Sequence, residues 1–305
     1  LSRFRCDHVA GDAHAIIMPG FIDAHTHCTQ CFVRSLTSGE LPMIPRIYSP
    51  AQRSLNPEQA ATTVRLIAAQ LLRSGITTMC EGTLNPSHEP AIVQAIEESG
   101  IRCVMARGAA DQDFHHAALY SQITDRSWYK AREGQAEKEL LATEDFLQRH
   151  PARGDGLIRG AVNVSALLNF SEAYFKGGAE LARRHDTTMQ VHIGRDREEV
   201  EFCLAAFGRR PVERLADLGV IDEHLVAVHA VLASEKEIVV LSVNEPEVSN
   251  VDLDKAFEKH FEALNSTDDV VKKCQMNNQF IKSYWDLYDD QVCFHGFASS
   301  ISSNF

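Results

Sequence analysis

The feature that most constrains the fold is an alternation of short apolar runs with longer amphipathic stretches, from residue 15 to about residue 243. This alternation predicts repeated βα units around a parallel sheet, because a helix usually makes the crossover between two parallel strands. Strands are expected at residues 15–18 with 20–24, 76–80, 101–105, 157–164, 188–192 and 225–229. Six such units suit either an open doubly wound sheet or most of an eight-stranded barrel, and periodicity alone does not choose between them.

Helix-terminating residues mark the crossovers between the expected strands. A helix is predicted over about 57–74, where Asn56 can cap the start, Pro57 suits the first position and Gly75 follows the end. Further helices are expected from Pro90 to Gly100, over about 133–149, from Ser171 to Arg184 and after a capping box formed by Ser234 and Glu237. Most of the expected strands are therefore followed by a helix.

The pattern changes after about residue 243. Residues 251–290 contain no strand-like run and carry apolar residues at helical spacing, which predicts two short helices. The mostly polar residues 298–305 are expected to be disordered. We therefore divide the chain into a barrel part over 1–243 and a divergent helical and disordered C-terminal segment over 244–305.

Composition and charge argue against several classes of function. The formal net charge of −12 at pH 7 disfavours a nucleic-acid partner, which needs clustered Lys and Arg. The sequence shows no signal peptide and no apolar run of the roughly 18 residues that a membrane span needs, so we expect a soluble cytoplasmic protein without a membrane partner. The eight cysteines are scattered, and Cys28 and Cys31 are interpreted as packing thiols although they form a CxxC pair. No glycine motif for a nucleotide follows the first strand.

Four histidines stand at the ends of expected strands. His25 and His27 are two residues apart, so in a strand they project to the same side. His192 and His229 also end expected strands, at the rim where parallel α/β folds build active sites. Four imidazoles at one rim suit zinc or another borderline divalent ion, which lowers the pKa of bound water and so supports hydrolysis.

Several segments carry a family resemblance. The sequence Pro-Gly-Phe-Ile-Asp-Ala-His-Thr-His at residues 19–27 resembles the first-strand motif of the amidohydrolase superfamily. Residues 34–43 and 72–78 resemble its branch of S-adenosylhomocysteine and methylthioadenosine deaminases, guanine deaminase and triazine chlorohydrolases. Residues 192–194 with 199–202 resemble the fifth-strand motif, and residues 228–230 with 234–238 the sixth. The resemblance covers about residues 15–240.

The resemblance implies a distorted, TIM-like (β/α)8 barrel of a metal-dependent hydrolase. It implies one divalent metal ion on His25, His27, His192 and His229, with zinc expected first and iron as an alternative. The implied reaction acts on a carbon–nitrogen bond other than a peptide bond: a metal-activated water deaminates, or dechlorinates, a small nitrogen heterocycle. Glu81, just past the second strand, would face the same rim and is a candidate substrate contact.

The chain departs from the family pattern at three places. Arg195 occupies the position three residues after the fifth-strand histidine, where the family has a proton-shuttling glutamate; Asp196 is our candidate for that catalytic role, with Glu198 and Glu199 nearby. The eighth-strand aspartate has no counterpart, since the Thr-Asp within residues 265–269 follows a helical pattern and suits a helix N-cap. Strands seven and eight and the N-terminal strands are also missing. The barrel is therefore expected to be incomplete, with its gap covered by residues 243–305 or by a second subunit.

Three readings of function remain open. The first is an active amidohydrolase, which we favour slightly over the second, a truncated and inactive relative with a binding role or none. The third is an α/β binding protein with structural histidines. In the loop after the third strand, His115 and His116 with Asp111 and Asp113 are interpreted as a solvated polar loop, with substrate contact as the alternative.

Overall fold

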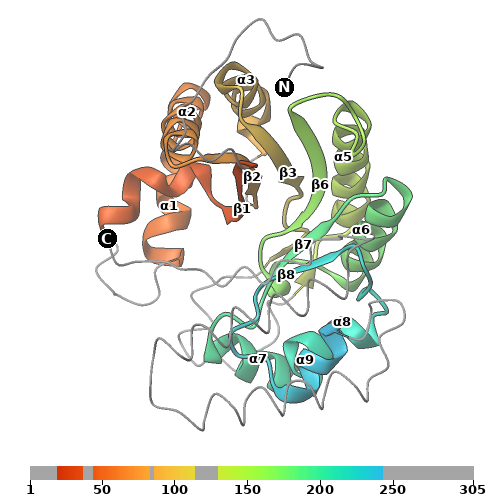
Figure 1. The fold of residues 1–305 in the computed structure, drawn as a ribbon. Helices are drawn as coiled ribbons and strands as arrows, with labels where there is room; N and C mark the ends of the chain where they lie inside the picture. The colour runs from red at the N-terminus through yellow and green to blue at the C-terminus, as the bar shows by residue number, and fades with distance from the viewer. Residues whose placement is uncertain (1–18, 37–43, 83–85, 114–129, 243–305) are drawn as a thin grey trace, which may run out of the picture.

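The structure is a computed structural model that describes residues 19–36, 44–82, 86–113 and 130–242. Its main feature is a six-stranded parallel sheet (Figure 1). The strands are β1 (Phe21–Thr26), β2 (Ile76–Glu81), β3 (Arg102–Arg107), β6 (Ile158–Val164), β7 (Met189–Ile193) and β8 (Leu225–His229), and they lie side by side in that order. A doubly wound sheet reverses its strand order at a switch point, so this unbroken order identifies the barrel alternative.

Helices connect the strands and cover the outer side of the sheet (Figure 1). They are α1 (Ser49–Ser54), α2 (Pro57–Arg73), α3 (Glu89–Ser99), α5 (Gln135–Arg149), α6 (Glu172–Arg184), α7 (Arg197–Phe207), α8 (Pro211–Asp217) and α9 (Glu235–Ser242). Short 3-10 helices run over Cys28–Leu36, Pro86–His88 and Leu167–Asn169, a π-helix over Ile44–Tyr48, and the two-residue strands β4 (Gln112–Asp113) and β5 (Lys130–Ala131) pair antiparallel. No helix in the described part of the chain has the length and apolar character that crossing a membrane requires.

Local capping chemistry explains where the helices begin and end. Asn56 and Gln59 form a capping box at the start of α2, and Ser171 caps α6 by accepting a hydrogen bond from the Tyr174 N–H. Gly100 ends α3 in the left-handed conformation that glycine adopts without steric cost. The six expected strands and the five expected helices are all confirmed within the described residues. Helices α1, α7 and α8 were not predicted. The first part of the first expected strand, residues 15–18, and everything expected after residue 243 lie outside the described residues.

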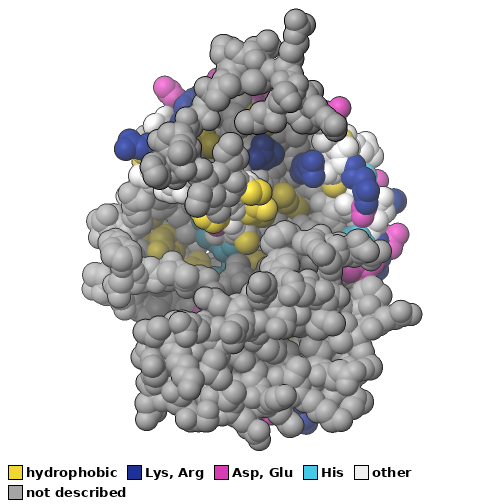
Figure 2. Space-filling model, in the orientation of Figure 1, with side chains coloured by type: hydrophobic (Ala, Val, Ile, Leu, Met, Phe, Trp, Pro, Cys, Tyr) yellow, Lys and Arg dark blue, Asp and Glu magenta, His cyan; other side chains and the backbone are white. Residues whose placement is uncertain are grey.

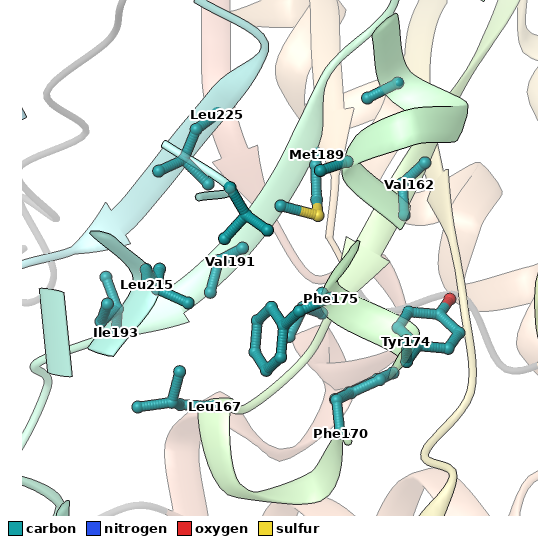
Figure 3. Packing of buried hydrophobic residues seen from close by; sticks show 14 of the residues in the cluster. Val162, Leu167, Phe170, Tyr174, Phe175, Met189, Val191, Ile193, Leu215 and Leu225 are labelled. Carbon is teal, nitrogen blue, oxygen red and sulfur yellow. The ribbon is translucent and has the colours of Figure 1, made fainter. Parts of the chain in front are cut away.

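The outer face of the sheet is apolar and packs against the helices in two clusters. In the first, Met79 and Met105 meet small and branched residues of α2 and α3. In the second, Val162, Met189 and Val191 meet Phe175 and other residues of α6, as Figure 3 shows. Because side chains alternate along a strand, the residues between these outward-facing ones must face the inside of the barrel.

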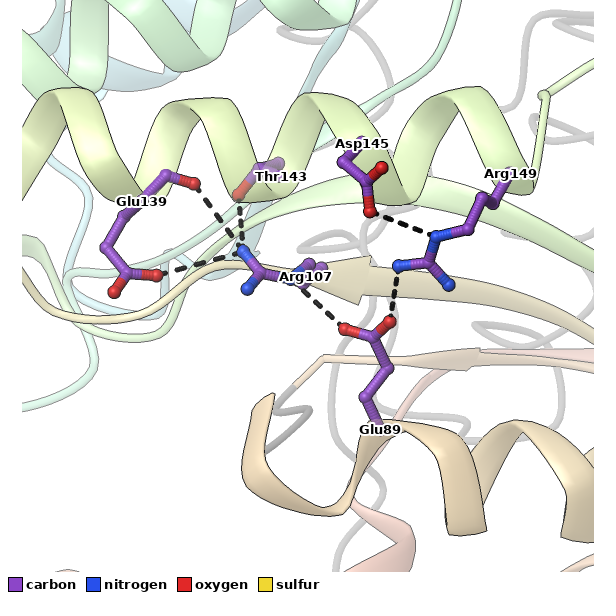
Figure 4. A network of polar contacts seen from close by, with 6 residues as sticks. All are labelled: Glu89, Arg107, Glu139, Thr143, Asp145 and Arg149. Atoms are coloured by element: carbon purple, nitrogen blue, oxygen red, sulfur yellow. Dashed lines mark hydrogen bonds and ion pairs between the residues drawn. The ribbon is translucent and has the colours of Figure 1, made fainter.

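A polar network ties the end of β3 to the helices beside it (Figure 4). The buried guanidinium of Arg107 donates to Glu89 Oε2 at 3.2 Å and to Thr143 Oγ1 at 3.1 Å. Arg149 binds the other oxygen of the same Glu89 carboxylate at 2.6 Å. Buried charges are tolerated only when they are paired and hydrogen-bonded in this way, so the network fixes α3 and α5 against the sheet.

Candidate metal centre

Three of the four predicted histidines bring the same ring nitrogen to one point. The Nε2 atoms of His25 and His27 lie 3.1 Å apart. The Nε2 atom of His192 lies 3.1 Å from that of His25 and 3.3 Å from that of His27. Histidine side chains are visible in a recess of the surface beside apolar side chains (Figure 2). The nitrogens belong to His25 at the end of β1, His27 just after β1, and His192 on β7, so residues more than 160 positions apart in the sequence form the cluster.

The cluster also shows how strongly the sheet is curved. β1 is one edge of the six-stranded sheet, and β7 and β8 lie at the other end of the strand order. Two side chains from opposite ends of a flat sheet of this width could not touch, because neighbouring strands are about 4.8 Å apart. Contact between His25 and His192 therefore requires the sheet to roll up around the histidines, as a barrel does.

His229 lies near the cluster because of an unusual backbone conformation at the end of β8. In the β7–β8 pairing it lies opposite Ile193, which is fully buried in the outer apolar cluster, so strand alternation alone would point His229 away from the other histidines. Its φ of 74° and the φ of 49° at Ala230 take the chain out of the strand conformation. The His229 ring centroid consequently lies 5.3 Å from that of His192 and 5.9 Å from that of His25. His229 is thus a neighbour of the three converging nitrogens.

The cluster holds its imidazoles in the neutral form. Burial lowers the pKa of His25 to about 4 and that of His27 to about 3, with a further decrease from neighbouring histidines. Burial also takes the pKa of His192 well below its ordinary value, and burial followed by the charge of Arg195 lowers that of His229. At neutral pH each ring is therefore a neutral imidazole, which is the form that binds a metal ion.

The spacing of the nitrogens fits a tetrahedral metal ion. With zinc–nitrogen bonds of about 2.0–2.1 Å, tetrahedral geometry separates neighbouring ligand nitrogens by about 3.3 Å. The three observed Nε2 separations, 3.1, 3.1 and 3.3 Å, agree with that value. His25, His27 and His192 are also the group of described residues whose ligand atoms lie close enough together to hold one ion.

The acidic residues after β7 are tied to the turn that follows the strand. Asp196 caps α7 by accepting from the Glu199 N–H at 3.1 Å, and its other oxygen pairs with Arg195. Glu199 is buried and accepts from the N–H groups of Gly194 and Arg195, at 3.2 and 3.3 Å. Burial raises the pKa of Glu199 to about 7, although the two N–H groups oppose the shift. Asp196 stays a predicted catalytic residue, and in this structure it caps α7 and pairs with Arg195.

The remaining residues singled out in the sequence differ in burial and in hydrogen bonding. Glu81 is buried, and its carboxylate accepts from the Cys28 N–H at 2.6 Å. Asp111 is fully buried and accepts from the Ser171 N–H at 2.8 Å, so the expectation of a solvated polar loop is wrong for this residue. His115, His116 and residues 265–269 lie outside the described residues. Cys28 is buried with its sulfur 3.7 Å from that of Met79 and is a free thiol, as the packing interpretation predicted.

Two inward-facing amides below the histidines were not predicted from the sequence. Asn163 on β6 pairs in register with Gln190 on β7, and His192 follows Gln190 on the same face. Both amide side chains are almost fully buried. The signal was present, since an amide flanked by apolar residues in a strand marks a position that faces a polar interior.

The fold and the histidine cluster define a parallel βα barrel with a candidate metal centre at its rim. The family model for the amidohydrolase family matches residues 16–279. The chain therefore belongs to the amidohydrolase family.

Individual proteins and solved structures are similar to this chain. A 5-methylthioadenosine/S-adenosylhomocysteine deaminase of Syntrophobacter fumaroxidans is 29% identical over 241 residues, which cover 78% of this chain and 50% of that enzyme. Among solved structures, an adenosine deaminase from Xanthomonas campestris with bound zinc aligns with a TM-score of 0.59 and 24% identity, covering 74% of this chain and 48% of that one. An atrazine chlorohydrolase from Arthrobacter aurescens complexed with zinc aligns with a TM-score of 0.58 and 17% identity, over 74% and 51%. The chain spans about half the length of the curated relative.

Proposed function

We propose that this chain is the barrel part of a metal-dependent hydrolase that removes an amino or chloro substituent from a small nitrogen heterocycle. The observation that carries the proposal is the convergence of the His25, His27 and His192 Nε2 atoms within 3.3 Å of one another. The named activities of the relatives, deamination of purine compounds and dechlorination of a triazine, support this substrate class. Iron remains the alternative to zinc, because imidazole ligands suit both.

Each residue of the centre has a proposed task. His25, His27 and His192 would hold the ion through Nε2, with His229 beside them as the fourth ligand. A divalent ion held there supplies Lewis acidity and lowers the pKa of coordinated water toward neutrality. Asp196 is retained as the proposed proton-transfer residue, and its pairing with Arg195 would have to open for that role. Glu199 is a second candidate, because a pKa of about 7 suits proton exchange at neutral pH.

The first experiment measures the metal content of the purified protein. The protein is stripped with a chelator, loaded with zinc, desalted and analysed by inductively coupled plasma mass spectrometry. We expect close to one zinc per chain, lost in the His25→Ala/His192→Ala variant. A matched variant, His150→Ala/His224→Ala, removes two histidines elsewhere and should keep its zinc. Equal zinc in all three proteins would overturn the proposed centre.

The second experiment separates an active enzyme from an inactive relative. Zinc-loaded protein is incubated with adenosine-type nucleosides, guanine and a chlorotriazine, and the release of ammonia or chloride is measured. Turnover that the double His25 and His192 variant lacks supports the proposed hydrolysis. Stoichiometric zinc without any release would favour the alternative reading, a metal-binding relative that does not catalyse the reaction.

A further inference from the structure

The end of β2 lies directly against the end of β1, where His25 and His27 stand. In the β1–β2 pairing Thr26 lies opposite Glu81, so Glu81 is level with the residue between His25 and His27. On its other side Glu81 lies opposite Met105 of β3, which is fully buried in the outer apolar cluster. Glu81 therefore points to the helix side of the sheet, and its residue is only 3% exposed.

Two hydrogen bonds, one made by Glu81 and one by Gly82, hold the backbone on both sides of His27. The Glu81 carboxylate accepts from the Cys28 N–H, just after His27, at 2.6 Å. The Gly82 N–H donates to the Thr26 carbonyl oxygen, just before His27, at 3.1 Å. A carboxylate acceptor makes the first bond charge-assisted and so stronger than an ordinary backbone hydrogen bond. Rotation of the His27 peptide planes would break both bonds.

Gly82 also provides the space in which the imidazoles lie. A Cβ at this position would be 2.8 Å from His25 Cε1, 3.1 Å from His25 Nδ1 and 3.5 Å from His27 Cε1. The first distance is shorter than carbon atoms tolerate, so the His25 ring would have to move. Gly82 is not among the glycines with positive φ, so its backbone conformation is open to other residues. The requirement at Gly82 is therefore one of space.

We propose that Glu81 and Gly82 are positioning residues of the metal centre: Glu81 fixes the backbone behind His27, and Gly82 leaves room for the ring of His25. This inference rests on the proposed metal centre and gives Glu81 a role different from the substrate contact expected from the sequence. The end of β2 would thus hold in place the two ligands at the end of β1, His25 and His27. Residues that orient metal ligands usually affect metal affinity by about 10-fold to 100-fold when they are removed.

The test measures zinc affinity by competition with a chromophoric chelator, together with the melting temperature of the metal-free protein. Glu81→Ala should weaken zinc binding at least about 10-fold. Glu81→Gln should recover much of the loss, because its amide oxygen can still accept from the Cys28 N–H. Gly82→Ala should weaken zinc binding by a similar factor through displacement of His25.

Two matched variants control for general loss of stability. Glu89→Ala removes another buried carboxylate, and Gly178→Ala adds a methyl group 3.2 Å from Val162 in the core, away from the histidines. Both should change the melting temperature while zinc affinity stays at the wild-type value. A purely structural role of Glu81 would make Glu81→Ala resemble Glu89→Ala.

The outcomes are distinguishable. Wild-type zinc affinity in both Glu81→Ala and Gly82→Ala overturns the positioning role while the metal centre stands. If Glu81→Ala does not fold, Gly82→Ala and Glu81→Gln decide the matter in the same assay. Failure of the wild-type protein to bind zinc through His25 and His192 overturns the metal centre itself, and the positioning role with it.

Discussion

Glu199 offers a quantitative test of how burial acts beside the candidate centre. Its carboxyl is buried, and burial raises its pKa from 4.5 to about 7. A raised pKa means that the folded state binds the proton more tightly than the unfolded state does. The stabilisation is fully present below pH 4.5 and is lost as the pH rises toward 7. Glu199→Gln, which cannot ionise, should remove this pH dependence.

The size of the effect follows from the shift in pKa. A change of about 2.5 units corresponds to about 3.4 kcal/mol between the two protonation states. Part of it is already lost at pH 5, since the unfolded carboxyl is then largely ionised. Between pH 5 and pH 8 the wild-type protein should lose about 2.5 kcal/mol of folding free energy through Glu199 alone.

The assay is urea unfolding of metal-free wild type and Glu199→Gln at several pH values from 5 to 8. Other titrating groups affect both proteins, so the difference between the two curves isolates Glu199. We expect Glu199→Gln to gain about 2.5 kcal/mol relative to wild type over this range. Parallel curves would refute the reasoning, because they would mean that the N–H groups of Gly194 and Arg195 fully compensate the cost of burying the charge.

Three further predictions concern the network and the histidines. Arg107→Ala should lower the free energy of unfolding, measured with urea, by about 3–5 kcal/mol, because it leaves Glu89 buried with one partner fewer. The same substitution in a Glu89→Ala background should cost less, and that smaller loss would confirm the pairing of the two residues. Zinc at 100 times its dissociation constant should stabilise the protein by about 2.7 kcal/mol and raise its melting temperature by roughly 4 °C in scanning calorimetry. An equal rise in the His25→Ala/His192→Ala variant would contradict this prediction. Burial lowers the pKa values of His25 and His27 to about 4 and about 3. The metal-free protein should therefore lose folding free energy as the pH falls below about 6.5, where the histidines of the unfolded chain take up protons. Urea unfolding should show a smaller loss in the His25→Ala/His192→Ala variant.

Local chemistry explains which parts of the fold were predictable. The N-cap at Asn56 and the left-handed Gly100 act within one turn of a helix, so the sequence alone located α2 and α3 closely. The same reasoning could have placed α7 and α8, since Asp196 and Pro211 are start signals of the same kind. The rolling of the sheet into a barrel shape was not predictable from periodicity, because it depends on curvature accumulated over all the strands.

The site was predictable only in part, because side-chain direction depends on register between strands. His25, His27 and His192 follow from alternation, since each lies on an inward-facing position. Glu81 ends a strand at the same rim, yet its pairing with Met105 puts it on the opposite face. Position at the end of a strand therefore identifies a candidate site residue, and only the register between strands decides which face of the sheet its side chain lies on.

His229 shows why strand alternation fails at the rim itself. A non-glycine residue with positive φ costs on the order of 1–3 kcal/mol, and such residues persist where surrounding structure fixes them. Here the fixing contacts are hydrogen bonds from the Ala230 N–H to the Ile193 carbonyl oxygen at 2.9 Å and from the Leu232 N–H to the Gly194 carbonyl oxygen at 3.0 Å. These bonds tie the strained turn to the end of β7, the strand that carries His192. The strain at His229 thus has a structural source and a consequence, because the same turn brings a fourth imidazole to centroid distances of 5.3 Å from the ring of His192 and 5.9 Å from that of His25.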